Sequence, residues 1–372
     1  MNCLSKTILL LIFSVSSLAS CKKNTEQDNL SPANDNWPTD RNRSVTQGLN
    51  FPWEILWGKD DNIWVTERPG RIRRINPRTG EITFTHTITE IVSTGEGGLL
   101  GMVHHPDFLS NGFIYVVYNY NKNTTYTEKV VRFTFSNNAL SNPTTLIDDI
   151  PAASIHNGSR LLISPDNKLF ITTGDAANTA FSQNTASLAG KVLRINLDGT
   201  IPTDNPITGN PAWSWGHRNQ QGLVMNNNIL YASEHGPNIE DEVNIIIKGR
   251  NYGWPNVNGP CDGAELTFCN TNNIAQPIFS SGSSTLAYCG LDYYGNSRIS
   301  QWTNSLLMVT LKDQSLIQMK LSNDGLTFIS SAIFFKNQFG RLRDICVSPT
   351  GRVYVCTSIG GNADRLIEIQ QL

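Results

Sequence analysis

The sequence predicts an all-β fold, a six-bladed β-propeller whose blades are four-stranded antiparallel sheets. One short strand pattern occurs six times, and every copy is rich in the β-branched and aromatic residues that strands prefer. The copies begin roughly 45–75 residues apart, which agrees with blades of about 40–50 residues that carry inserted loops. Helical periodicity is nearly absent. The six copies occupy residues 62–66, 113–117, 168–172, 229–233, 305–309 and 352–356.

Most copies are followed by a second strand that combines basic and apolar residues. Turn-forming sequences at residues 164–167 and 348–351 precede two of the repeated strands. An irregular β-sandwich is the alternative fold, but a sandwich would not repeat strand-turn-strand units along its whole length. The second strands occupy residues 71–75, 129–133, 191–195, 316–320 and 365–369.

The composition permits one large core and argues against a nucleic-acid partner. Of the 372 residues, 39% are hydrophobic and 9% are aromatic, and an all-β chain of this length can form a single domain. The formal net charge is −2, whereas nucleic-acid binding requires a strongly basic face. We therefore predict one propeller domain over residues 47–372 and no nucleic-acid partner.

The first 46 residues differ from this body. Residues 1–20 combine Lys6 with an apolar run too short to span a bilayer, followed by small residues, which is typical of a signal peptide. Cys21 then resembles the cleavage site of a bacterial lipoprotein, which implies a lipidated mature N-terminus; an ordinary signal peptide with a chance cysteine is the alternative. Residues 21–46 are rich in Asn, Asp, Ser and Pro and are expected to form a disordered tether.

These features predict an exported protein that contacts the membrane only through its N-terminal lipid. Several acyl chains on one cysteine anchor stably, whereas a single chain is marginal. Lys22 does not resemble the acidic signal that retains lipoproteins in the inner membrane. We expect the outer membrane, with the body in the periplasm or at the cell surface.

Five of the seven cysteines lie in the predicted propeller, and an exported chain meets an oxidising compartment. Cys261 and Cys269 bracket a short loop containing Gly, which predicts a local disulfide. Cys346 and Cys356 flank a turn and could face each other, and the pairing of Cys289 stays open. No spacing indicates a zinc site or a catalytic thiol.

The polar loops next to the repeated strands carry the functional chemistry, because propeller ligands bind around the central channel. Four cations, Arg218, Lys312, Arg341 and Arg343, come from three blades and occupy corresponding places. Cations that converge without matching carboxylates favour an anionic ligand. Residues 234–242 are dense in carboxylates and contain Gly-Pro, which suits a hard cation such as calcium.

Several motifs in and around these loops occur in one order along the chain. They are Gly-Gly-Leu-Leu-Gly at 97–101, His-Pro-Asp-Phe at 105–108, residues 190–199, Gly-His-Arg-Asn at 216–219, Asp-Glu-Val-Asn at 241–244 and Asn-Tyr-Gly-Trp-Pro at 251–255. Together they resemble the soluble PQQ-dependent glucose dehydrogenase and aldose sugar dehydrogenase (glucose/sorbosone dehydrogenase) family, from about Leu49 to the C-terminus. The resemblance implies oxidation of an aldose at its anomeric carbon with PQQ and Ca²⁺, and an external electron acceptor.

The resemblance also implies roles for matching residues. His156 matches the general base that takes the proton of the anomeric hydroxyl, after which hydride passes to the quinone. The positions that match contacts to the quinone tricarboxylate are Arg218, Asn219, Lys312, Arg341 and Arg343.

Two calcium sites are implied in the same way. The backbone carbonyls of Gly236 and Pro237 match ligands of a calcium that also binds PQQ and acts as a Lewis acid. Glu242 and the Tyr252 carbonyl match a second, structural calcium site.

The substrate side departs from the family pattern. Glu96 stands where the glucose enzymes carry Gln beside the sugar, and a carboxylate there would repel an anionic cofactor unless it is protonated or paired. Ile155 replaces an Asp that could orient the base, residues 278–286 lack the aromatic pair that holds glucose, and Tyr-Cys at 288–289 replaces Pro-Ser. We therefore carry over PQQ chemistry but not glucose specificity. Three further residues are expected to hold blades together: Arg160, Asp175 and Trp254.

Two alternatives remain open. The first is a non-catalytic binding propeller. The hedgehog-interacting proteins, which are relatives of this fold, resemble binding modules, and Glu96 resembles the variation seen in them. A calcium-dependent hydrolase such as a lactonase would need several inward carboxylates and neutral amides around one ion, rather than a nest of cations.

Overall fold

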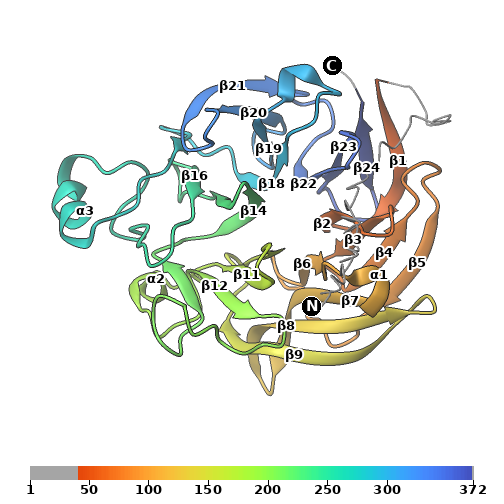
Figure 1. Ribbon diagram of the computed structural model, residues 1–372, viewed down its shortest axis with the longest axis horizontal. Helices are drawn as coiled ribbons and strands as arrows, with labels where there is room; N and C mark the ends of the chain where they lie inside the picture. The colour runs from red at the N-terminus through yellow and green to blue at the C-terminus, as the bar shows by residue number, and fades with distance from the viewer. Residues whose placement is uncertain (1–40, 371–372) are drawn as a thin grey trace, which may run out of the picture. The chain divides into compact units, whose positions relative to one another are not determined.

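Each repeated segment folds into a four-stranded antiparallel sheet, so the predicted six-bladed β-propeller is confirmed (Figure 1). The structure is a computed structural model that describes residues 41–370. The predicted signal peptide, the lipidated Cys21 and most of the predicted tether lie outside the described residues. Within residues 41–370, no helix combines the length and apolar character needed to cross a bilayer.

The six blades follow one another along the chain. The first blade contains β2 (Pro52–Trp57), β3 (Ile63–Glu67), β4 (Arg71–Ile75) and β5 (Ile82–Thr87). The second contains β6 (Leu99–His104), β7 (Phe113–Lys122), β8 (Thr125–Ser136) and β9 (Ala139–Pro151). The third contains β10 (Gly158–Ile163), β11 (Lys168–Thr173), β12 (Lys191–Asn196) and β13 (Ala212–Trp215). The fourth blade contains β14 (Gln220–Asn226), β15 (Ile229–Glu234), β16 (Glu242–Ile245) and β17 (Phe279–Ser280). The fifth contains β18 (Tyr288–Tyr294), β19 (Ser305–Thr310), β20 (Leu316–Leu321) and β21 (Phe328–Phe334). The sixth contains β22 (Leu342–Val347), β23 (Val353–Thr357), β24 (Asp364–Ile369) and β1 (Asn42–Leu49).

Helices are few and short. They are α1 (Phe108–Asn111), α2 (Ala180–Gln183), α3 (Leu266–Asn272), and the 3-10 turns η1 (Gly263–Glu265) and η2 (Ser300–Trp302).

The two ends of the described chain close the ring of blades. The first strands β2, β6, β10, β14, β18 and β22 each contact the next, and β22 contacts β2. Strand β1 pairs with β24 from Asn42 opposite Ile369 to Leu49 opposite Asp364. The predicted start of the propeller at residue 47 is therefore wrong by five residues, because β1 begins at Asn42 as the outer strand of the last blade.

The predicted repeat is the second strand of every blade. These strands are buried along nearly their whole length, as in β3 and β23, where all residues are buried. Burial on both faces selects an unbroken run of β-branched and aromatic residues. The predicted partner strands are the third strands β4, β8, β12, β20 and β24.

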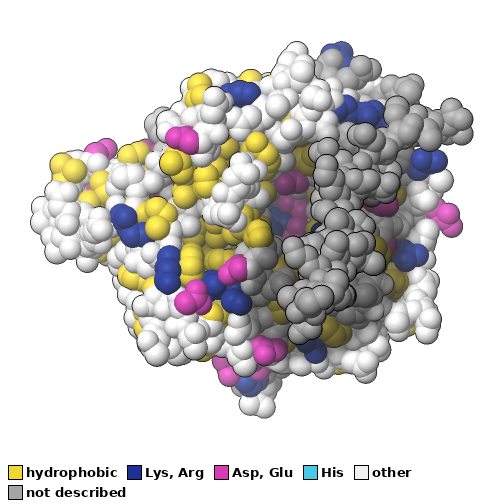
Figure 2. All heavy atoms as spheres, in the orientation of Figure 1, with side chains coloured by type: hydrophobic (Ala, Val, Ile, Leu, Met, Phe, Trp, Pro, Cys, Tyr) yellow, Lys and Arg dark blue, Asp and Glu magenta, His cyan; other side chains and the backbone are white. Residues whose placement is uncertain are grey.

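Charged side chains also join blades in the channel. The Arg160 guanidinium lies 2.7 Å from a Glu54 carboxylate oxygen and 3.0 Å from one of Asp344, so it links three blades as predicted. One face of the molecule is hollowed, and acidic and basic side chains are visible in the hollow beside hydrophobic ones (Figure 2).

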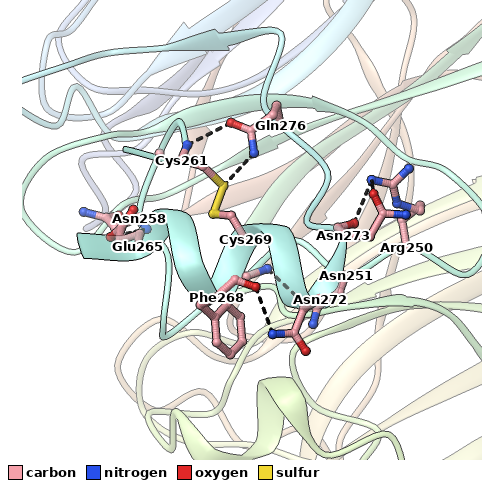
Figure 3. Close-up of a disulfide and its surroundings, with 12 residues drawn as sticks. Arg250, Asn251, Asn258, Cys261, Glu265, Phe268, Cys269, Asn272, Asn273 and Gln276 are labelled. Atoms are coloured by element: carbon pink, nitrogen blue, oxygen red, sulfur yellow. Dashed lines mark hydrogen bonds between the residues drawn. A yellow bond between two sulfur atoms is a disulfide. The ribbon is translucent and has the colours of Figure 1, made fainter. Parts of the chain in front are cut away.

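The cysteine predictions hold in part. Cys261 and Cys269 form the predicted disulfide, which ties α3 to the loop before it (Figure 3). Cys346 and Cys356 lie on the neighbouring strands β22 and β23, but Cys346 is opposite Tyr354 rather than Cys356. Both are free and buried, as is Cys289.

Candidate active site

The strand directions bring the predicted site residues to one mouth of the channel. In an antiparallel blade, the start of the first strand and the end of the second lie at the same edge. His156, Arg218 and Arg341 precede the first strands β10, β14 and β22, whereas His235 and Lys312 follow the second strands β15 and β19. The repeat therefore places loops that are far apart in sequence around one opening.

A buried carboxylate orients His156. Its Nδ1 lies 2.8 Å from Asp175 Oδ1, and Asp175 Oδ2 accepts a hydrogen bond of 2.9 Å from Trp254 Nε1. The His156 side chain retains 16% exposure, whereas that of Asp175 is 1% exposed. The prediction that Asp175 and Trp254 only hold blades together is therefore incomplete. Asp175 supplies the orienting carboxylate that Ile155 cannot.

The backbone around His156 requires glycine neighbours. His156 itself has φ +58°, and Gly158 has φ +67°. A Cβ at Gly174 would lie only 1.9 Å from the His156 carbonyl oxygen. These constraints let the loop pack against the end of β11 and present the imidazole at the mouth.

Glu96 lies beside this pair. Its Oε2 accepts a hydrogen bond of 3.3 Å from the His156 backbone N–H. Burial lowers the pKa values of Arg218 and of Arg68, a residue that the sequence argument overlooked, and the nearby negative charge of Glu96 opposes this change. Glu96 thus lies near two positive charges, although it forms no ion pair with either arginine within residues 41–370.

Arg218 is held over Trp254. Its guanidinium carbon lies 5.4 Å from the Trp254 ring centroid, and its Nη1 donates to the His235 carbonyl over 3.0 Å. Burial lowers the Arg218 pKa, and its buried Nε has no hydrogen-bond partner within residues 41–370. An arginine with an unsatisfied buried donor has capacity left for an acceptor such as a carboxylate.

A buried amide network joins Arg343 to the His156 loop. The Arg343 guanidinium donates to the Gln221 side-chain oxygen. Gln221 Nε2 donates to Asn219 Oδ1 over 3.4 Å, and the same oxygen accepts from the Gly158 N–H at 3.1 Å. Arg343, Gln221 and Asn219 are all buried. Gln221 was not predicted, although it follows Asn219 by two residues.

The predicted cations converge to different degrees. Burial, with Arg343 and Arg218 nearby, lowers the pKa of His235 to about 3, so both guanidinium groups lie near this imidazole. Arg341 is exposed, and the exposed Lys312 donates to Thr285 Oγ1 over 3.0 Å. Arg218 and Arg343 therefore form the inner part of the cluster, and Arg341 and Lys312 lie at its rim. None of the four has an ion-pair partner among the described residues.

The Gly236–Pro237 segment offers free oxygens. Neither carbonyl accepts a hydrogen bond from any described residue, whereas the Gly236 N–H donates to Asp241 Oδ1 over 2.9 Å. Asp241 Oδ2 also accepts from the Leu286 and Ala287 N–H groups at 2.6 and 2.7 Å. Asp241 thus fixes the loop and leaves two carbonyls for a hard cation.

An acidic cavity borders this loop, and Gly236 is one of its lining residues. Glu234, Glu240, Glu242 and Tyr252 line a cavity of about 10 Å³, close to the space that one water molecule needs. Burial and then the nearby Glu234 raise the pKa of Glu242 to about 8. Glu242 lies at the start of β16 rather than in a loop. No three His, Cys, Asp or Glu side chains in the described part of the chain form a ready metal cluster, so carbonyls such as that of Tyr252 would have to complete a site.

Comparisons with known proteins identify the family that the chain matches. A family model described as "Glucose / Sorbosone dehydrogenase" matches residues 49–367. Quinoprotein glucose dehydrogenase B of Acinetobacter calcoaceticus is 32% identical, covering 86% of this chain and 86% of its own length. Aldose sugar dehydrogenase YliI of Escherichia coli strain K12 is 31% identical over 83% of this chain and 87% of its own length. The PQQ-bound aldose sugar dehydrogenase structure from Streptomyces coelicolor is 30% identical, with a TM-score of 0.76 over 88% of this chain and 96% of its own.

Proposed function

The chain belongs to the glucose / sorbosone dehydrogenase family, and we propose that it is a PQQ- and calcium-dependent dehydrogenase that oxidises an aldose sugar at the anomeric carbon. Two electrons leave the sugar with the hydride of that carbon, and the hydroxyl proton leaves to a base. An external acceptor outside the cytoplasm then reoxidises the enzyme. The relatives named for quinoprotein and aldose sugar activity support this proposal.

The His156–Asp175 pair beside unpaired arginines supports it most directly. His156 would take the anomeric hydroxyl proton, and the Asp175 carboxylate at 2.8 Å would stabilise the resulting imidazolium and fix its tautomer. Such a base contributes roughly 10²–10⁴ in rate. When bound, PQQ would supply the hydride acceptor and calcium would polarise its quinone oxygen.

The chain's own residues fit both groups. Arg218 and Arg343, with Arg341 and Lys312 at the rim, suit the three carboxylates of PQQ. Asn219 would help to position the Arg343 guanidinium through Gln221. The free carbonyls of Gly236 and Pro237 suit the calcium beside PQQ, and Glu242 with the Tyr252 carbonyl suits a structural one.

The alternatives account for less of this arrangement. A non-catalytic binding propeller has no use for an imidazole on a buried carboxylate. A lactonase needs carboxylates and amides around one ion, whereas arginines occupy this mouth. We therefore favour the dehydrogenase activity over both alternatives.

The proposal extends to location: an exported protein anchored through Cys21 to the outer membrane. The motif ending at Cys21 supports this. Labelled fatty acid should enter the wild type and not the Cys21→Ser variant, and labelling of that variant would contradict the anchor.

The variant His156→Ala tests the chemistry. With PQQ, calcium and a dye acceptor, its turnover of aldoses should fall at least about 100-fold, while its affinity for PQQ stays near that of the wild type. His86→Ala is a matched control, because His86 lies on the outer strand β5, away from the mouth. Equal turnover in His156→Ala would remove this residue from the mechanism.

A further inference from the structure

Arg68 occupies the place in the first blade that site residues occupy in three others. It directly follows the second strand β3, just as His235 follows β15. Asp175 and Lys312 lie two residues beyond the ends of β11 and β19. Because the ends of the second strands share one mouth, the fold places Arg68 beside the cations described above.

The Arg68 guanidinium is fixed but not saturated. Its Nη1 donates to the Gly95 carbonyl over 2.7 Å, and its guanidinium carbon lies 4.2 Å from the Phe51 ring centroid. Phe51 is held in turn by its N–H, which donates to Asp364 Oδ2 over 2.9 Å. The buried Nε of Arg68 has no hydrogen-bond partner, and Arg68 makes no ion pair, within residues 41–370.

Its electrostatic surroundings call for an anion. Burial and the nearby Arg343 lower the pKa of Arg68 to about 10, and Glu96 opposes this change. Two arginines from different blades are thus held near each other at a cost, without carboxylates bonded to them. A bound anion would relieve this repulsion and satisfy the open donors.

We propose that Arg68 is a further anion-binding residue of this mouth, supplied by the first blade, and that it contacts a carboxylate of the PQQ invoked in the proposed function, on which this inference rests. Arg68 would add a positive charge to the cations around this mouth, on the side opposite Arg218. Phe51 would act as a positioning residue that keeps the guanidinium planar against its ring.

PQQ titration of the calcium-loaded protein, followed by quenching of tryptophan fluorescence, tests the proposal without any turnover. Arg68→Gln removes the charge but can still donate to the Gly95 carbonyl, and it should raise the Kd for PQQ about 10- to 100-fold. Arg68→Lys keeps the charge and should retain more affinity than Arg68→Gln. Arg298→Gln is the matched control, because Arg298 is exposed in the β18–β19 loop, away from this mouth, and its Kd should equal that of the wild type.

Salt provides a second readout. Loss of one ionic contact should make the dependence of the Kd on salt concentration shallower in Arg68→Gln than in the wild type. An unchanged Kd in Arg68→Gln, or equal losses in Arg68→Gln and Arg68→Lys, would overturn this inference alone. A wild type that does not bind PQQ would overturn the inference and the proposed function together.

Discussion

Glu128 connects the stability of the propeller to pH through two loops of the site. It lies on β8, and 1% of its surface is exposed. Its Oε2 accepts hydrogen bonds from Ser159 Oγ at 2.6 Å and Asn119 Nδ2 at 3.3 Å. Asn119 also accepts from the Gly98 N–H at 2.9 Å, so one carboxyl group supports the segments that carry Glu96 and His156.

Burial raises the pKa of Glu128 from 4.5 to about 8. Between these values the folded chain holds a proton that the unfolded chain has released. The free energy of unfolding therefore falls as pH rises, by about 1.4 kcal/mol per pH unit from this group alone. Between pH 5 and pH 7 the loss amounts to about 2.7 kcal/mol, and it ends as pH passes through the folded pKa.

The variant Glu128→Gln removes this titration. The free energy of unfolding of the wild type minus that of the variant, from denaturant titrations, should decrease by about 2.7 kcal/mol from pH 5 to pH 7. Taking the difference cancels all groups that titrate alike in both proteins. Glu81→Gln, at an exposed position, should give a difference that does not change with pH. A pH-independent difference for Glu128→Gln would refute the raised pKa.

Two further predictions concern the site and the channel. Asp175→Asn should lower the turnover of the PQQ-loaded enzyme about 10- to 100-fold, because it removes a charged hydrogen bond to His156 worth about 1.5–3 kcal/mol; an unchanged rate in the dye-linked assay would mean that Asp175 has only a structural role. Arg160→Met should lower the free energy of unfolding by about 3–5 kcal/mol, because it leaves Glu54 and Asp344 buried without their partner; a loss below about 1 kcal/mol in urea titrations would contradict this.

The sequence predicts the middle of each blade better than its edges. Second strands such as β11 and β19 are buried on both faces, so their apolar runs are visible without knowing their neighbours. The sequence places residues 42–46 of β1 in the tether, because this strand is polar except at positions such as Val45 and Leu49. Its partner β24 lies at the other end of the chain, and no local pattern reveals that pairing.

The site was predictable where the residue itself carries the chemistry. His156 and Arg218 stand in recognisable motifs, and their loops meet because blade topology requires it. Asp175 was misjudged because its bond to His156 depends on how the loop after β11 folds back. Arg68 could have been found, since it lies two residues beyond the first copy of the repeat. The position of Lys312 at the rim depends on how its loop packs against Thr285, which the spacing of the motifs does not predict.

An absorbance titration tests the central claim most directly. PQQ is added stepwise to the calcium-loaded protein, and each of a panel of aldoses is then added to the saturated complex. The account predicts saturation at about one PQQ per chain, as expected for one mouth with one cationic cluster, and bleaching of the bound quinone by at least one sugar. Absence of saturable binding, or a holo spectrum that no sugar in the panel changes, would contradict it.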